Sequence, residues 1–201
     1  MNKYIMFGPQ GSGKSTQSRL LAQAYDIVHI SIGEVFRWNI DNHTKLAAQV
    51  QRLLTSGHLV PDEIVEQVVR ERLELHDWNY GFVLDGFPRT RRQAEYLFEN
   101  WNMDKVIYLN VPDEVVEKRV LQRARQGFGG GFTKRADDNP ESLRVRMQQY
   151  HEKTKPLLEL YKQKCMLIDI NGELPISGVY SRIIEALGLT PPLKRPQTDS
   201  R

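Results

Sequence analysis

A glycine-rich stretch near the start of the chain has the residue types and spacing of a phosphate-binding loop. Its sequence, Gly8-Pro-Gln-Gly-Ser-Gly-Lys-Ser-Thr16, fits the pattern G-x-x-x-x-G-K-[ST]. In this pattern the glycines let successive backbone N–H groups wrap an anion, and the lysine reaches the outer phosphates. An ordinary glycine-rich turn is the alternative. The flanking sequence favours a nucleotide site, because a strand is expected over Lys3–Phe7 and a helix over Lys14–Tyr25.

A second group of reactive side chains follows another apolar run. The sequence Asp85-Gly-Phe-Pro-Arg89 comes directly after the strand expected over residues 81–84. An acidic residue at a strand end beside a phosphate loop is well placed to hold the Mg²⁺ of a nucleotide through water, and Ser15 offers a hydroxyl ligand. Arg89 is expected to face the same phosphates. Taken alone, the Asp-Gly pair is equally typical of a turn, and Arg89 could equally be a surface charge.

The elements that position these groups alternate between short β-rich runs and longer helical stretches. Strands are expected over residues 3–7, 27–30, 81–84, 105–111 and 166–170. Such alternation is typical of βαβ units and predicts an α/β fold with a five-stranded parallel sheet covered by helices on both faces. Ligands of such sheets bind at the carboxyl ends of the strands, where both groups of residues lie.

Two segments do not follow this alternation. Residues 33–75 are helical in pattern throughout and are expected to form an insertion. A run with four glycines, Gly127-Phe-Gly-Gly-Gly131, separates two helices, the later one starting near Asn139-Pro140. A flap and a disordered linker are both compatible with this run, and the flanking arginines favour a flap. The proline-rich end, residues 190–201, is expected to be disordered.

The composition fits one globular domain and limits the classes of partner. The 201 residues carry a net charge of +3 and are 40% hydrophobic, which allows a core without disulfides. Because the basic residues are scattered, nucleic acid is not an expected partner. There is no signal segment or run of about 18 apolar residues, so no membrane association is expected and the predicted location is cytoplasmic. Cys165, in an apolar run, is predicted to be a small core residue and not a nucleophile.

Taken together, several motifs in the same order resemble adenylate kinase, of the nucleoside monophosphate (NMP) kinase family and the short-lid type. The resemblance runs over residues 3–187. The motifs that carry it, besides the phosphate loop and Asp85-Gly-Phe-Pro-Arg89 with Gln93, are Ile30-Ser-Ile-Gly-Glu-Val-Phe-Arg37, Gly57-His-Leu-Val-Pro-Asp-Glu63, Asn110-Val-Pro-Asp113 and Arg135-Ala-Asp-Asp-Asn139.

The resemblance implies a P-loop NTPase-type core and reversible Mg-dependent transfer of a phosphoryl group, ATP + AMP = 2 ADP. The core would comprise residues 1–32, 76–126 and 138–189. Residues 33–75 would be the NMP-binding insertion, and residues 127–137 a short lid without the zinc site of some long-lid relatives. A monomer is expected, and Mg²⁺ that accompanies ATP is the expected cofactor.

The resemblance also assigns roles to individual residues. The ATP-binding set would be Gly11, Ser12, Gly13, Lys14, Ser15, Thr16, Arg119, Arg123 and Leu174. The NMP-binding set would be Ile32, Gly33, Arg37, His58, Leu59, Val60, Gly86, Phe87, Pro88, Arg89, Gln93, Arg135 and Arg146. Lys14, Arg89, Arg123, Arg135 and Arg146 would be catalytic, and Ser15 and Asp85 would hold the magnesium.

Arginine suits this chemistry because its planar, permanently charged group can stabilise charge spread over the transferring phosphoryl group. An alternative explains the spacing of Arg119, Arg123 and Arg146 about equally well, namely the solvated face of helices. Four further arginines fit that alternative better and are expected at the surface: Arg91, Arg92, Arg125 and Arg144.

Several positions depart from the family pattern, among them Phe36 and the glycine-rich lid. Ile32 stands where adenylate kinases usually present threonine and where uridylate/cytidylate kinases usually present alanine. Gln93, in contrast, favours adenine. AMP is therefore the expected acceptor, and another NMP, such as CMP or UMP, is the alternative. Ser15 replaces the usual glycine without threatening magnesium binding. Trp38 could pack in the core or line the acceptor pocket. A nucleotide-binding protein of this fold without turnover is a further alternative.

Overall fold

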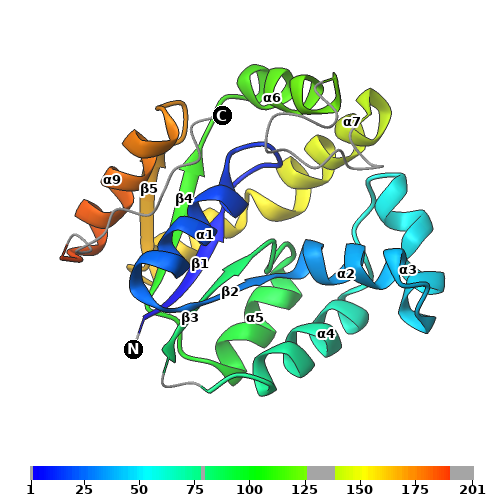
Figure 1. Ribbon diagram of the computed structural model, residues 1–201, viewed down its shortest axis with the longest axis horizontal. Helices are drawn as coiled ribbons and strands as arrows, with labels where there is room; N and C mark the ends of the chain where they lie inside the picture. The colour runs from blue at the N-terminus through cyan, green and yellow to red at the C-terminus, as the bar shows by residue number, and fades with distance from the viewer. Residues whose placement is uncertain (1, 78–79, 126–138, 191–201) are drawn as a thin grey trace.

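The computed structural model describes residues 2–77, 80–125 and 139–190 (Figure 1). The strands are β1 (Lys3–Phe7), β2 (Val28–Ser31), β3 (Phe82–Asp85), β4 (Lys105–Asn110) and β5 (Leu167–Asn171). The helices are α1 (Lys14–Tyr25), α2 (Ile32–Asp41), α3 (Lys45–Thr55), α4 (Asp62–Glu74), α5 (Arg91–Asn100), α6 (Asp113–Arg125), α7 (Pro140–Gln149), the π-helical turn η2 (Tyr150–Thr154), α8 (Leu157–Gln163) and α9 (Ile176–Leu187).

The strands form one five-stranded parallel sheet in the order β2-β3-β1-β4-β5. The α/β fold and the parallel sheet predicted from the sequence are therefore confirmed. β1 has the predicted bounds, and the other strands begin or end a residue or so away. Because all strands run the same way, their carboxyl ends share one edge, at which the loops after β1 and β3 lie together.

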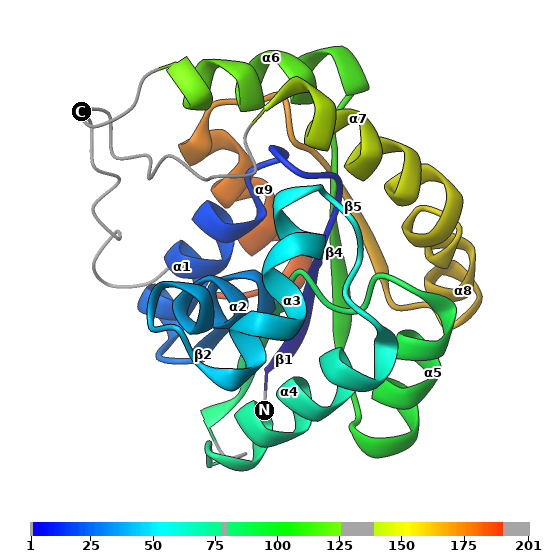
Figure 2. The ribbon, with the colours of Figure 1, turned by 90° about the vertical axis from the view of Figure 1, so that its right-hand side faces the viewer.

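Helices cover both faces of the sheet, as predicted. On one face α1 and α9 pack on Met6, Val83 and Ile107. On the other face α4, α5 and α8 cover Ile5 and Leu84 (Figure 2). Side chains alternate between the faces along each strand, so neighbouring residues of β1 enter different clusters. The sheet thereby has one hydrophobic core above it and one below.

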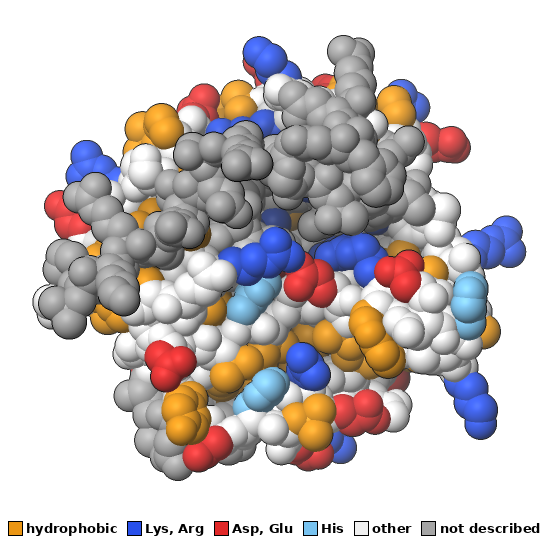
Figure 3. Space-filling view, in the orientation of Figure 1, with side chains coloured by type: hydrophobic (Ala, Val, Ile, Leu, Met, Phe, Trp, Pro, Cys, Tyr) orange, Lys and Arg blue, Asp and Glu red, His pale blue; other side chains and the backbone are white. Residues whose placement is uncertain are grey.

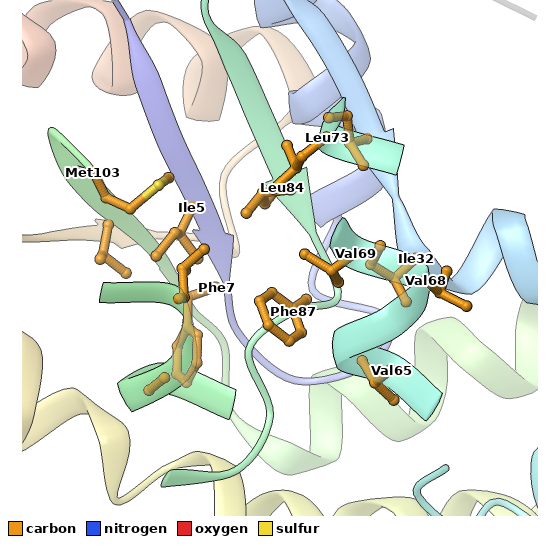
Figure 4. Close-up of a cluster of buried hydrophobic side chains, with 14 of the residues drawn as sticks. Ile5, Phe7, Ile32, Val65, Val68, Val69, Leu73, Leu84, Phe87 and Met103 are labelled. Atoms are coloured by element: carbon orange, nitrogen blue, oxygen red, sulfur yellow. The ribbon is translucent and has the colours of Figure 1, made fainter. Parts of the chain in front are cut away.

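The three helices α2, α3 and α4 occupy the predicted insertion. Side chains at their N-caps begin two of them: Ser31 accepts from the Glu34 N–H, and Thr44 accepts from the Ala47 N–H. Helix α4 presents Val65, Val68, Val69 and Leu73 to the core that also holds Leu84 of β3 and Phe87 (Figure 4). The last helix of the insertion therefore packs on the sheet, whereas α2 and α3 project from it (Figure 1).

The prediction that Cys165 is a core residue is wrong. Its side chain is exposed, and its backbone has a φ of 53° in the turn after α8. The Cys165 N–H donates to the Lys162 carbonyl, and the Cys165 carbonyl accepts from Lys105 Nζ. The first bond belongs to the turn that ends α8 and the second comes from β4, and the apolar run enters the sheet only from Leu167.

Three further predictions concern residues near or beyond the limits of the description. The lid over 127–137 lies outside the described residues, as does the tail beyond Thr190. Helix α7 begins with Asn139 as N-cap and Pro140 as its first residue, as predicted. Within the described part of the chain, no helix is both long and apolar enough to cross a membrane.

Candidate active site

The phosphate loop connects β1 to α1 at the carboxyl edge of the sheet. Gly8 has a φ of 141°, and a Cβ there would lie 2.8 Å from the Leu109 carbonyl oxygen, so only glycine fits. Lys14 folds back over the loop, and its Nζ donates to the Pro9 carbonyl at 2.6 Å. The ammonium group therefore lies against the curve of the loop, where it can reach the outer phosphates of a nucleotide.

Helix α1 opens toward this loop. Its N-cap, Gly13, is left-handed and contributes no side-chain hydrogen bond, in contrast to Ser31 of α2 and Thr90 of α5. A helix N-terminus carries partial positive charge and N–H groups that point along the axis. The start of α1 therefore complements an anion held in the loop.

Asp85 ends β3 next to this helix start. Its side chain is buried, with only 3% of the residue exposed. Ser15 Oγ donates to Asp85 Oδ2 at 2.5 Å, and His29 Nε2 lies 3.8 Å from the same oxygen. Burial by itself would raise the pKa of the Asp85 carboxyl, but the neighbouring His29, Lys14 and Ser15 outweigh it and lower the pKa from 3.8 to about 2.

The sequence paired Ser15 with Asp85 as magnesium ligands, and the structure brings the two side chains together. Hydroxyl and carboxylate oxygens are the donors that Mg²⁺ prefers, and the Asp85 carboxyl is ionised at neutral pH because of its low pKa. The donor set therefore fits magnesium. Among the described residues there is no group of three His, Cys, Asp or Glu side chains that could hold a metal. The predicted absence of a lid zinc site concerns residues outside that description and stays a prediction.

The ionised Asp85 should make stability fall with acidity. Its pKa is lower in the folded protein than the ordinary 3.8, so the carboxylate stabilises the fold above pH 3.8, and this contribution is lost as the pH falls through about 2. In urea titrations with EDTA, the wild-type protein should therefore lose about 1 kcal/mol more than Asp85→Asn between about pH 6 and about pH 3. A difference between the two proteins that does not change with pH would contradict this prediction.

Arg89 follows a turn in which Gly86 has a φ of 81° and the Phe87-Pro88 peptide bond is cis. Three separate contacts hold the arginine. Its N–H donates to Gln93 Oε1 at 2.8 Å, its Nε donates to the Gly86 carbonyl at 2.8 Å, and its carbonyl accepts from Thr154 Oγ1 at 2.8 Å. Both the backbone and the guanidinium of Arg89 are therefore fixed before any ligand binds.

Gln93 is part of the same network and is only 1% exposed. While its Oε1 accepts from Arg89, its Nε2 donates to Asp62 Oδ1 at 2.7 Å, and Thr90 Oγ1 donates to the same Asp62 oxygen at 3.0 Å. Both polar atoms of the Gln93 amide thus have protein partners. Each atom keeps capacity for one further hydrogen bond, because the NH2 group has a second hydrogen and the oxygen a second lone pair.

Arg146 reaches the site from α7. Its Nη1 donates to Gln10 Oε1 in the phosphate loop at 2.7 Å, and its Nη2 donates to the Leu54 carbonyl in α3 at 3.0 Å. Arg144, two residues earlier, is exposed. A solvated helix face therefore describes Arg144 but not Arg146, which joins the loop to the insertion.

The other arginines that the structure describes differ in exposure. Arg91 and Arg92 are exposed and pair with Glu95, Glu63 and Glu66 at the surface. Arg119 and Arg123 on α6 are partly buried. Arg135 and the side chain of Arg125 lie outside the described residues.

The remaining predicted acceptor residues that the structure describes lie in α2 and in the segment between α3 and α4. Ile32 is 2% exposed and packs in the core beside α4 (Figure 4). A Cβ on Gly33 would lie 3.2 Å from Arg37 Nη1, so this arginine folds back along its own helix. His58 is exposed, with its Nδ1 2.9 Å from Ser56 Oγ, whereas Val60 is buried.

Two exposed residues complete the comparison with the sequence. Trp38 is 61% exposed, which excludes the core-packing alternative. Leu174 is also exposed and precedes α9, where Gln17 Nε2 of α1 donates to the Ile176 carbonyl at 2.9 Å. The start of α9, two residues after Leu174, is thereby tied to the helix that follows the phosphate loop.

Basic side chains gather on one face of the molecule. Figure 3 shows Lys and Arg side chains in the middle of the face that it presents, above an apolar area. Sequence reasoning did not single out Gln10, Asp62 or Thr154, which hold Arg146, Gln93 and Arg89. Gln10 and Asp62 did carry a signal, because Gln10 lies within the quoted phosphate loop and Asp62 within the quoted motif that starts at Gly57, whereas Thr154 lies in no quoted motif.

Comparisons with known proteins agree with this geometry. The family model described as adenylate kinase matches residues 6–166. An adenylate kinase of Cyanothece sp. is 42% identical over 188 residues, covering 91% of this chain and 93% of the relative. One from Corynebacterium urealyticum is 41% identical over 177 residues, covering 86% and 92%. One from Lachnospira eligens is 38% identical over 212 residues, covering 92% and 100%.

Proposed function

The chain belongs to the adenylate kinase family, and on that premise we propose that it transfers a phosphoryl group reversibly between Mg·ATP and AMP, giving two ADP. The observation that supports this most is the contact of Arg146 with Gln10. It joins an arginine from α7 to the phosphate loop, at the edge where Lys14, Asp85 and Arg89 also lie.

The proposed chemistry relies on charge and not on a covalent intermediate. A transferring phosphoryl group spreads negative charge over its three outer oxygens, and fixed cations lower the energy of that state. Lys14 serves the donor phosphates, and Arg89 and Arg146 approach from the acceptor side. Arg123 and Arg135 join them in the proposal, the latter from the lid. Magnesium, held by Ser15 and Asp85, would neutralise part of the charge on the donor phosphates.

We assign the two nucleotides to different parts of the site. The loop from Gly11 to Thr16, with Arg119, Arg123 and Leu174, binds ATP in this proposal. The insertion of residues 33–75 and the turn from Gly86 to Arg89 bind the monophosphate. Closure of the lid over both would exclude water, which otherwise competes as phosphoryl acceptor. Action as a monomer in the cytoplasm stays a prediction from the sequence.

AMP is the proposed acceptor. Ile32 has no hydroxyl to offer a base, and its side chain is buried in the core. Discrimination must therefore come from the neighbouring polar groups. We expect kcat/KM at fixed Mg·ATP to be at least about tenfold higher for AMP than for CMP, UMP or GMP, which is the range that one or two hydrogen bonds provide.

The measurement is a coupled assay of ADP formation with each of the four monophosphates. A clear preference for CMP or UMP would reject AMP as the acceptor while keeping the kinase. Binding of ATP and AMP without turnover would instead indicate the non-catalytic alternative, and calorimetry on the same preparation distinguishes the two outcomes.

A further inference from the structure

One face of α7 contacts the backbone at the end of α3 and in the segment that connects α3 to α4. Arg146 Nη2 donates to the Leu54 carbonyl at 3.0 Å. A Cβ on Gly57 would lie 2.4 Å from the Ser142 carbonyl oxygen, so the two backbones touch. Gln149 Oε1 accepts from the Leu59 N–H at 2.9 Å. Residues 142, 146 and 149 are spaced by four and three, which places them on one side of a helix.

The contact of Gln149 differs from the others because its partner, the Leu59 N–H, does not belong to a helix or a strand. The N–H groups of Gly57 and His58 donate to the Leu54 and Leu53 carbonyls and so belong to the end of α3. Helix α4 begins only at Asp62. Leu59 lies between these helices in a stretch without secondary structure. Its N–H is therefore held from α7 by a side chain.

The same helix carries Arg146, which contacts the phosphate loop. Gln149 is three residues further along α7 and thus ties the position of the Leu59 backbone to that of Arg146. A shift of the segment relative to α7 would move whatever the segment binds away from the reacting phosphates. Such coupling affects the ligand of this segment and leaves the ATP side unchanged.

We propose that Gln149 is a positioning residue for the acceptor nucleotide, which it serves by fixing the backbone of residues 58–60 against α7. The inference rests on the proposed function, in which His58, Leu59 and Val60 line the pocket for the acceptor base. Gln149 acts through the Leu59 backbone and touches neither nucleotide.

The test compares variants of similar length that keep or remove the acceptor atom. Gln149→Met removes the oxygen and should raise the KM for AMP about five- to tenfold, the effect of one lost hydrogen bond. The KM for ATP and kcat should stay within about twofold. Gln149→Glu keeps an oxygen acceptor and should stay within about threefold of the wild type in the KM for AMP. Equal losses on both substrates, or no loss, would overturn the proposal.

The neighbouring Gln148 provides the control. It is exposed and donates to Glu152 Oε1 at 2.8 Å on the same helix, without contact to the insertion. Gln148→Met should leave the KM for AMP within about twofold, since an exposed contact contributes little. If both methionine variants weaken AMP alike, the effect belongs to α7 in general, and the proposal is wrong.

Two readouts separate this inference from the proposed function. Hydrogen exchange at the Leu59 amide should become about tenfold faster in Gln149→Met and not in Gln148→Met. Faster exchange with an unchanged affinity for AMP would show a real contact that does not position the acceptor, which overturns the proposal. Calorimetry compares the Kd for AMP of Gln149→Met with that of the wild type and does not require catalytic turnover. A wild-type protein that binds AMP without turnover would therefore reject only the proposed function.

Discussion

The Lys14→Met variant is expected to lose phosphoryl transfer by about 1000-fold or more in kcat, while its fold remains intact. Removing one preorganised donor that stabilises developing charge typically costs about 100- to 1000-fold, and this donor also carries a full charge. Methionine has a similar length and leaves the loop backbone free to wrap phosphate. The lysine contacts the Pro9 carbonyl and lies outside both hydrophobic cores, so its loss should not unfold the protein.

The matched control for this prediction is Lys105→Met. Lys105 Nζ also donates to a backbone carbonyl, that of Cys165 at 3.2 Å, but at the exposed start of β4, away from the phosphate loop. ADP formation by the control should stay within about twofold of the wild type. Thermal unfolding curves of the three proteins would show whether each is folded. Undiminished turnover of folded Lys14→Met would refute the placement of the active site.

Replacement of Arg89 by lysine is expected to reduce kcat/KM for AMP about 100-fold, although the positive charge is kept. Lysine lacks the planar fork that lets one group contact the Gly86 carbonyl and still present two nitrogens to a phosphate. The backbone contacts of residue 89 with Gln93 and Thr154 do not depend on the side chain and should persist. The variant thereby isolates the guanidinium from the network around it.

Arg91→Lys is the corresponding surface control. Arg91 pairs with Glu95 one turn along α5, and both side chains are more than half exposed, so the exchange should change kcat/KM by less than about twofold. Steady-state kinetics with varied AMP at saturating Mg·ATP gives the comparison. Equal small effects of Arg89→Lys and Arg91→Lys would mean that Arg89 is also a surface charge, the alternative that the sequence left open.

The arrangement of the elements could be read from the sequence because it depends on local patterns. Apolar runs such as residues 3–7 and the helical period of Lys14–Tyr25 extend over a few neighbouring residues, and β1 and α1 have the predicted bounds. The prediction for Cys165 was wrong for a related reason. Its apolar neighbours placed it in the run that enters the sheet. In the structure, the N–H groups of Cys165 and of the next residue, Met166, still donate to carbonyls of α8.

The sequence by itself determined the chemistry that is proposed for this protein: a predicted phosphate-binding loop, an acid at the end of β3 proposed for magnesium, and enough arginines to stabilise a transferring phosphoryl group. Only the tertiary structure decided which residues hold these groups in place. Arg146 meets Gln10 across 136 positions, Leu59 meets Gln149 across 90, and Thr154 meets Arg89 across 65. Contacts at such separations leave no periodic trace in the chain, because they depend on how the helices pack around the sheet.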